Sequence, residues 1–164
     1  PVSTGMGGPN PKGTALVAGL LAMQPLHKGV EVTALASPLQ CPALDYGSSF
    51  SRALEINTPN KRQVLVSGTA SISPDGKTLH EGDTAKQIQQ TMEVVEAILR
   101  TRSMDFTHVT RAVAYLKRAE DFPLFARYMS QRNLSGFPAV LLQNDVCWDE
   151  LLFEIEVDAV DTGS

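Results

Sequence analysis

Residues 63–102 read QVLVSGTASISPDGKTLHEGDTAKQIQQTMEVVEAILRTR, and this stretch decides the fold. The apolar run Val64–Val66 is closed by Ser67 and Gly68, which predicts a buried strand that ends at a special backbone position. Residues 73–76, SPDG, carry Pro and Gly where a tight turn needs them. We therefore expect a strand, a turn-rich connector and a helix lying back over a sheet, with the rest of the chain attached to this unit.

An amphipathic helix is predicted from Thr84 onward. Thr84 with Gln87 three residues later has the form of a capping box, which satisfies otherwise unpaired backbone N–H groups. Apolar residues then recur at spacings of four, three and four, which makes one stripe of a helix: Ile88, Met92, Val95 and Leu99. The polar residues that fall largely off this stripe are Gln87, Gln89, Gln90, Glu93, Glu96 and Arg100.

Other elements follow on both sides of this unit. Residues 1–13 are rich in Gly and Pro and are expected to form a loop or an extended arm. A second helix is predicted at residues 121–132, where Pro123 lies early and aromatic residues recur at helical spacing. Apolar runs or period-two alternation predict strands at residues 14–23, 29–35, 54–56, 108–116, 139–142 and 151–157.

The order of these elements favours an α+β fold, with two helices packed on one face of a mixed β-sheet. The chain of 164 residues has the length of a single domain. We divide it into an N-terminal arm with strands, residues 1–62, and a core unit, residues 63–160. Because residues 16–23 are apolar on both sides, the other sheet face is expected to be covered by self-association.

The composition excludes several kinds of partner. A net charge of −4 and a pI near 5.3 offer no attraction to nucleic acid or to an anionic membrane. No apolar run approaches the roughly 20 residues of a membrane-spanning helix. No basic segment followed by an apolar one marks a secretory signal. We therefore expect a cytoplasmic protein that binds neither nucleic acid nor membrane.

The cysteines and histidines predict no metal and no cofactor. Cys41 and Cys147 make neither a disulfide framework nor a metal knuckle, which fits a reducing cytoplasm. His27, His80 and His108 have no metal-ligand spacing with one another or with the cysteines. A Gly-rich phosphate loop followed by Lys-Ser/Thr is absent as well.

Residues 63–160 carry four motifs in an order that resembles the RidA/YjgF family. The motifs are LVSGTASI after a strand, GD opening a Gln-bearing helix, THVTRAVAYLKRAEDFPLFARYMSQ, and LLFEIEVDAV as a closing strand. The family comprises reactive-intermediate deaminases and often carries the label "endoribonuclease L-PSP". The resemblance implies a chorismate-mutase-like fold and a homotrimer with ligand clefts between adjacent subunits.

A narrower set of motifs resembles the C-terminal half of chorismatases. The set is TGMG at residues 4–7, the predicted strand TALVAGLLAM at residues 14–23, the Tyr46-Gly47 turn, FSRA at residues 50–53, His80 before Gly82-Asp83, and Cys147 ahead of LLFEIE. Those enzymes hydrolyse or rearrange chorismate with loss of pyruvate. Their N-terminal half is absent here and the chain starts at Pro1 rather than Met, so we expect a partial or cleaved chain.

Glu154 is the candidate catalytic residue. It lies between Phe153 and Ile155 in a predicted strand. In a dry cleft, desolvation would raise the pKa of its carboxyl and make it a general acid near neutral pH. The alternative is a solvent-facing carboxylate paired with a cation. The resemblance to chorismatases implies the first role, in which the matching glutamate protonates the enol ether of the substrate.

Five further residues are candidates for binding a substrate. The planar guanidinium of Arg52 suits a carboxylate, although a surface ion pair is the alternative. Tyr46 is a candidate to present its hydroxyl to the ligand, and simple packing of its ring is the alternative. Gly68 and Thr69 allow close approach of a ligand to the backbone or only form a bulge. Cys147 has no legible histidine partner that would make it a nucleophile, so a small, buried and inert thiol is the alternative to a place in the substrate site.

Three functions stay open, all with a small carboxylate metabolite as ligand. The first is a chorismatase-like hydrolase or lyase with Glu154 as the acid. The second is an imine or enamine deaminase, which is disfavoured because residues 137–141 lack the arginine that this family uses on the substrate carboxylate. The third is a non-catalytic binding or regulatory trimer, because Trp148 stands where chorismatases often carry an arginine.

Overall fold

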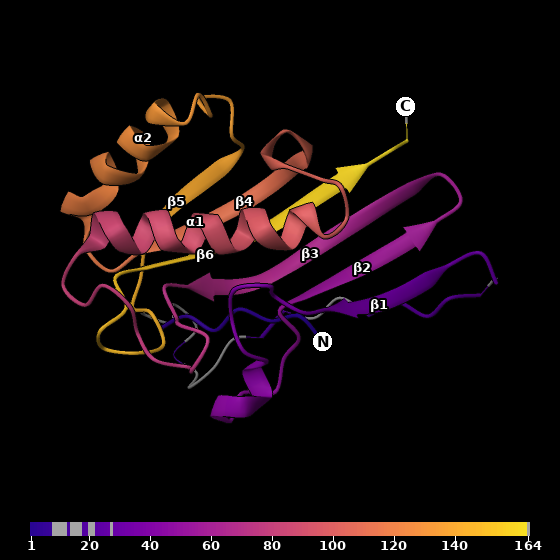
Figure 1. Ribbon diagram of the computed structural model, residues 1–164, viewed down its shortest axis with the longest axis horizontal. Helices are drawn as coiled ribbons and strands as arrows, with labels where there is room; N and C mark the ends of the chain where they lie inside the picture. Colours follow the sequence, from indigo (N-terminus) through magenta and orange to yellow (C-terminus); the bar gives the residue numbers. More distant parts are fainter. Residues whose placement is uncertain (8–12, 14–17, 20–21, 27, 164) are drawn as a thin grey trace.

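The computed structural model describes residues 1–7, 13, 18–19, 22–26 and 28–163. Its elements, in chain order, are β1 (Glu31–Leu35), β2 (Ala53–Thr58), β3 (Lys61–Ala70), α1 (Thr84–Arg100), β4 (Val109–Leu116), α2 (Phe122–Gln131), β5 (Ala139–Gln143) and β6 (Phe153–Asp161) (Figure 1). The predicted α+β fold is confirmed.

The strands form one six-stranded mixed sheet in the order β1-β2-β3-β6-β4-β5. All neighbouring pairs are antiparallel except β4 and β5, which run parallel because α2 crosses between them. The last strand of the chain, β6, therefore lies in the middle of the sheet between β3 and β4. A β-bulge interrupts the pairing of β3 with β6 between Val66 and Thr69.

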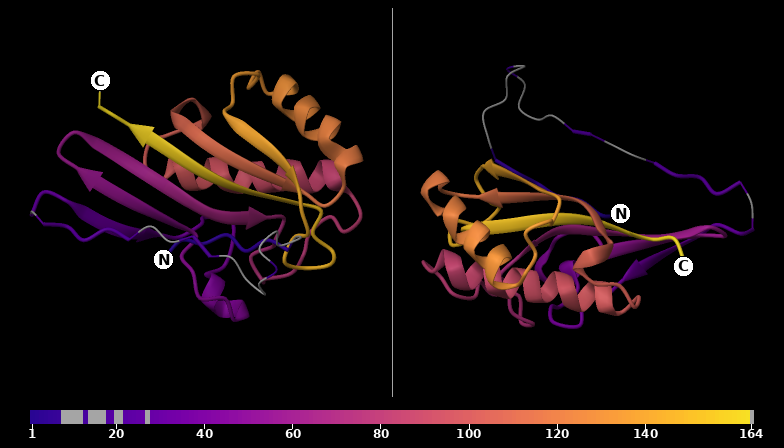
Figure 2. Two further views of the ribbon diagram at one scale, coloured as in Figure 1. Left: turned by 180° about the vertical axis from the view of Figure 1, so that it is seen from behind. Right: turned by 90° about the horizontal axis from the view of Figure 1, so that it is seen from above.

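Both helices cover the same face of the sheet, and residues 1–7 lie on the opposite side (Figure 2). The predicted stripe of α1 is buried against alternate residues of the central strands, which makes one continuous apolar core. On β6 this core takes Phe153, Ile155 and Val157. The residues between them, Glu154 and Glu156, consequently point to the face away from the helices.

The start of α1 differs from the sequence prediction. Asp83 is the N-cap, and its side chain accepts a hydrogen bond of 3.0 Å from the backbone N–H of Lys86. The hydroxyl of Thr84 instead donates to Asp121 at the start of α2, over 2.8 Å. The predicted capping box of Thr84 and Gln87 is therefore wrong, because an aspartate one residue earlier already satisfies the first turn.

The remaining elements follow the prediction, with one exception. Strands and the second helix form at the expected positions, with ends shifted by a few residues. The strand predicted at residues 14–23 falls mostly outside the described residues. The four members that are described, residues 18, 19, 22 and 23, belong to no strand and are exposed. Within the described part of the chain, no helix combines the length and the apolar character needed to cross a membrane.

Candidate functional site

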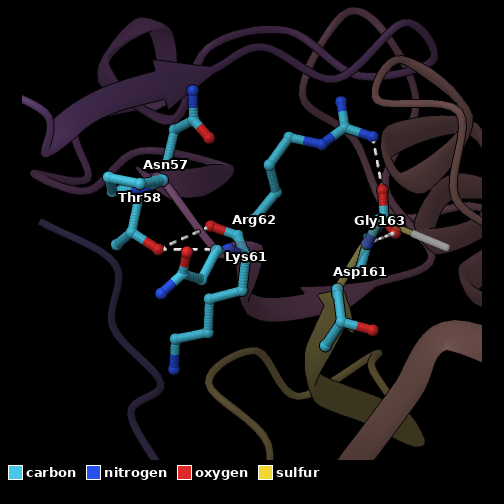
Figure 3. Close-up of a pocket in the computed structure, with 9 residues that line it drawn as sticks. Asn57, Thr58, Lys61, Arg62, Asp161 and Gly163 are labelled. Atoms are coloured by element: carbon cyan, nitrogen blue, oxygen red, sulfur yellow. Dashed lines mark hydrogen bonds and ion pairs between the residues drawn. The ribbon is translucent and has the colours of Figure 1, made fainter.

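One pocket of the described residues contains none of the residues predicted to act on a ligand. It has a volume of about 510 Å³ and lies beside the β2–β3 turn and the end of β6 (Figure 3). Two of its three charged side chains pair with each other, since Arg62 Nη2 lies 2.6 Å from Asp161 Oδ2. Asp161 is seven residues from Glu154 along β6, which is about 23 Å at roughly 3.3 Å per residue. We therefore place the candidate site elsewhere.

A second, smaller pocket brings together five of the six predicted site residues. It encloses about 80 Å³ on the sheet face away from the helices. Four segments form its wall: the N-terminal arm (residues 1–7), the loop before β2, the end of β3, and residues 147–154. The predicted residues that line it are Tyr46, Arg52, Gly68, Cys147 and Glu154.

Glu154 is the most perturbed group in this pocket. Glu154 is only 5% exposed. This burial, and to a smaller extent the nearby charge of Glu156, raises the pKa of its carboxyl from 4.5 to about 8. Glu156 and Asp158 lie on the same face of β6, but both are hydrogen-bonded to Arg111. Glu154 therefore lacks the cation that its neighbours share.

Gly68 makes room for this carboxyl. A Cβ atom at position 68 would lie 2.0 Å from Glu154 Oε1 and 2.9 Å from Thr4 Cγ2. The backbone N–H of Gly68 is held by the arm, since it donates to Ser3 O at 3.1 Å and to Thr4 Oγ1 at 3.0 Å. The β-bulge and the absence of a side chain at Gly68 together let the Glu154 carboxyl sit against the backbone.

Arg52 is buried and held in place by the chain itself. Its Nε and Nη2 atoms donate to the carbonyl oxygen of Cys41 at 3.0 and 2.8 Å. Its guanidinium also lies over two aromatic rings, 5.2 Å from the centre of Tyr46 and 5.7 Å from that of Phe50. The side chain is therefore oriented before any ligand binds, while Nη1 makes no hydrogen bond to the described residues.

The rest of the wall is aromatic and apolar. The rings of Tyr46 and Trp148 pack edge to face, with centroids 5.7 Å apart at 76°. Burial raises the pKa of the Tyr46 hydroxyl, against the opposing effect of the Arg52 charge, so it stays a neutral hydroxyl at physiological pH. Ile72 and Leu151 complete this side of the pocket.

Cys147 and Thr69 have structural partners. The thiol of Cys147 donates to Gly5 O at 3.0 Å, and burial raises its pKa, which disfavours the thiolate that a nucleophile needs. Thr69 is fully buried and its hydroxyl donates to Ser67 O at 2.8 Å. It does not line the pocket, so its position does not support a role in binding substrate. His80 is exposed and lies outside the pocket as well.

Several residues of the wall were not predicted. Ser3 and Gly5 enter through backbone hydrogen bonds of the arm, for which the sequence carries no side-chain pattern. Phe50 was named only as part of the FSRA motif, and Trp148 only as a residue in the place of an arginine. Their aromatic character next to candidate polar residues is the signal that could have identified them.

The pocket therefore combines one fixed cation, one carboxyl that holds its proton at neutral pH, and an aromatic wall. Such a set can bind an organic acid through Arg52 and transfer a proton from Glu154. Among the described residues, no group of three His, Cys, Asp or Glu side chains is placed to hold a metal ion.

Comparisons with known proteins agree with this architecture. Residues 43–161 match the family described as endoribonuclease L-PSP. A 3-hydroxybenzoate synthase of Streptomyces hygroscopicus is 29% identical over 144 residues, which cover 74% of this chain and 42% of that protein.

Two solved structures show the same fold. A chorismatase crystal structure superimposes with a TM-score of 0.69 and 24% identity, over 79% of this chain and 44% of the other. The YjgF protein of E. coli superimposes with a TM-score of 0.62 and 17% identity, over 78% of this chain and 98% of the other. This chain thus spans less than half of the synthase and of the chorismatase, but nearly all of YjgF.

Proposed function

Since this chain belongs to the endoribonuclease L-PSP family, which is the RidA/YjgF family, we propose that it binds a small carboxylate metabolite in the pocket around Glu154. We further propose that it acts on this ligand as a chorismatase-like hydrolase or lyase. The similarity to a 3-hydroxybenzoate synthase and the fold shared with a chorismatase support this choice of reaction.

The observation that carries the proposal is the buried carboxyl of Glu154. With a pKa of about 8, most of this carboxyl is protonated at pH 7. An acid whose pKa lies close to the working pH is well suited to donate a proton in a transition state. Burial and the charge of Glu156 raise this pKa, and no basic side chain contributes to it. We therefore take a bound substrate as the acceptor of the proton.

The reaction that fits this acid is cleavage of an enol ether. Glu154 transfers its proton to the terminal methylene carbon of the enolpyruvyl group, which leaves an oxocarbenium ion. Water adds to that ion, and the resulting hemiketal releases the ring alcohol and pyruvate. The proton lost by the water returns to the Glu154 carboxylate, so the acid is regenerated.

Arg52 is the proposed anchor for the carboxylate of the substrate. Its two bonds to Cys41 O and its stacking on Tyr46 and Phe50 fix the direction of the guanidinium. The unused Nη1 donors then approach a ligand at little further entropic cost. The aromatic rings of Tyr46 and Trp148 offer an apolar surface against which the ring of a ligand can pack.

The pocket is small for such a ligand. Its volume of about 80 Å³ falls below the roughly 300–1,000 Å³ of ordinary ligand sites. Ser3 and Gly5 form part of its wall and are joined to it by a few hydrogen bonds. We infer that the arm moves outward when a ring-bearing substrate enters.

We also propose that three copies of this chain assemble into a homotrimer. The sheet face away from the helices carries exposed apolar side chains on the edge strand β5, where Val140 is 58% and Leu142 is 42% exposed. Their alternates, Ala139 and Leu141, pack toward the core, so these two point outward from it. Burying such a surface against copies of the same chain would complete the ligand site at a subunit boundary.

A second candidate is a trimer that binds a carboxylate without chemistry. The observation that favours it is Trp148, which stands in the pocket wall at the position where chorismatases often carry an arginine. A third candidate, imine deamination, is weakened because residues 137–141 supply no guanidinium.

A turnover assay with two substrates separates the three candidates. Chorismate is supplied to one sample and freshly generated 2-aminoacrylate to another, and pyruvate release above the uncatalysed rate is followed in both. Release from chorismate alone supports the hydrolase or lyase, and acceleration with 2-aminoacrylate alone supports the deaminase. If neither is turned over but chorismate quenches the single tryptophan, Trp148, the protein is a binding module.

A further inference from the structure

We propose that Gln87, in the first turn of α1, is a positioning residue that fixes the wall of the pocket formed by residues 147–154. Its effect on turnover rests on the proposed function. Its effect on the geometry of the pocket does not.

Gln87 joins α1 to two segments outside the helix. Its side chain is fully buried. Its Nε2 donates to Glu150 O at 2.9 Å and to His80 O at 3.2 Å. Its Oε1 accepts from the backbone N–H of Leu152 at 2.8 Å. The side-chain amide of Gln87 thus links the turn before α1 to the backbone groups on either side of Leu151.

The segment that Gln87 holds carries the pocket wall. Leu151 lies between the two bonded residues and lines the pocket, and its own N–H donates to Trp148 O at 3.1 Å. Leu152 in turn accepts from the backbone N–H of Lys117 at 3.0 Å, which ties this segment to the end of β4. Glu154 follows only two residues later, so the register set at Leu152 also sets the position of its carboxyl.

Only a glutamine fits these three bonds. The two N–H donors face carbonyl oxygens and the amide oxygen faces an N–H group, which uses every donor of the side chain. Glutamate would place a second oxygen against two carbonyls, and methionine would leave all three backbone groups without a partner. Apolar packing alone would be served by an aliphatic residue, as at Ile88 beside it.

The first test compares Gln87→Met with Gln89→Met. Gln89 lies on the exposed side of the same helix and its side chain donates to Glu93 one turn later, so it is a matched control. Quenching of Trp148 fluorescence by acrylamide reports the wall, because the chain has a single tryptophan. We expect the quenching constant to rise about twofold or more in Gln87→Met and to stay unchanged in Gln89→Met.

The same two variants are used to follow the carboxyl of Glu154 by carbon NMR as the pH is changed. The wild-type midpoint is expected at about 8. A loosened wall admits water, so the midpoint in Gln87→Met should fall by about one unit or more. A loss of general core packing would not single out this carboxyl, and Gln89→Met should keep the wild-type midpoint.

Equal quenching constants and equal Glu154 midpoints in the two variants would overturn the inference. A second measurement needs no variant and decides the matter if Gln87→Met does not fold. In the wild type, the backbone N–H of Leu152 should exchange with solvent as slowly as those of β6. Exchange as fast as that of an open loop would contradict the bond to Gln87.

Turnover distinguishes this inference from the proposed function. If the wild type releases pyruvate, Gln87→Met should lower kcat about tenfold, with a smaller change in KM, because the proton donor is displaced. If the wild type releases none while Trp148 and Glu154 still respond to Gln87→Met, the proposed function fails and the positioning role stands.

Discussion

At the scale of single residues, the proposed reaction depends on the small space around Glu154 and on the absence of a cation paired with it among the described residues. The neighbouring acids on β6 share Arg111, whereas Glu154 lies against Gly68 in a pocket with aromatic walls. Alternation along the strand predicts which face Glu154 occupies. Its burial depends on the arm and on Gly68, which strand alternation does not reveal.

Replacing Glu154 with Gln should stabilise the protein at neutral pH. Folding raises the pKa of this carboxyl from 4.5 to about 8, so the folded state binds the extra proton and loses stability as the pH rises through that interval. At about 1.36 kcal/mol per pKa unit, the penalty reaches roughly 3 kcal/mol at pH 7 and vanishes near pH 4. Thermal unfolding of both proteins from pH 4 to pH 8 should show a growing gain in Tm for Glu154→Gln. A difference that does not change with pH would contradict the buried acid.

Gly68→Ala should displace the Glu154 carboxyl more than it disturbs the fold. The new methyl group would meet Glu154 Oε1 and Thr4 Cγ2, which are both side-chain atoms that can shift. We expect a loss of about 1–3 kcal/mol in unfolding free energy and a loss of at least about tenfold in turnover. Gly136→Ala is the control, because nothing lies within 4 Å of its added Cβ. Full activity in Gly68→Ala would show that the close contact is unimportant.

At the scale of elements, the strands and helices of the core unit were predictable because their apolar residues repeat with the period of the element. The stripe Ile88, Met92, Val95 and Leu99 is buried, as its spacing indicates. Polar residues were harder to place, since Gln87 has the same residue type as its exposed neighbour Gln89. Its burial follows from the path of residues 147–152, which local periodicity does not contain.

Asp83→Ala should weaken the start of α1. The backbone N–H of Lys86, and then its side chain, hold the pKa of the Asp83 carboxyl below its ordinary value of 3.8. This stabilisation is therefore present above the unfolded pKa and is lost as the pH falls through the lower folded value. Thermal unfolding should show a lower Tm for Asp83→Ala at pH 7 and a much smaller difference below pH 2. Glu81→Ala, at an exposed carboxylate two residues earlier, should change the Tm little. An equal loss in both variants would argue against the cap.

At the scale of the whole molecule, the helices cover one face of the sheet and residues 1–7 lie on the other (Figure 2). The pocket around Glu154 lies on this second face. The fold class and the two helices on one face follow from the order of the elements. The arm does not follow, because residues 1–7 reach Gly68 and Asp145 through backbone hydrogen bonds that any sequence could make.

The proposed trimer should depend on the outward face of β5. Changing both Val140 and Leu142 to Glu places charges where apolar side chains are exposed in the single chain. Sedimentation velocity should show a trimer for the wild type and a monomer for the double variant, with the secondary structure retained. A wild type that sediments as a monomer, or a variant that remains a trimer, would contradict this interface.

The central claim is that Glu154 delivers a proton to a bound enol ether. Pyruvate release from chorismate is measured for the wild type, for Glu154→Gln and for Glu156→Gln, which removes an acid from the same face of β6 that is paired with Arg111. We predict release by the wild type, a fall of at least about a hundredfold in Glu154→Gln, and a much smaller change in Glu156→Gln. Wild-type release that survives in Glu154→Gln would contradict the assignment of the acid, and no release from a folded wild type would contradict the proposed reaction.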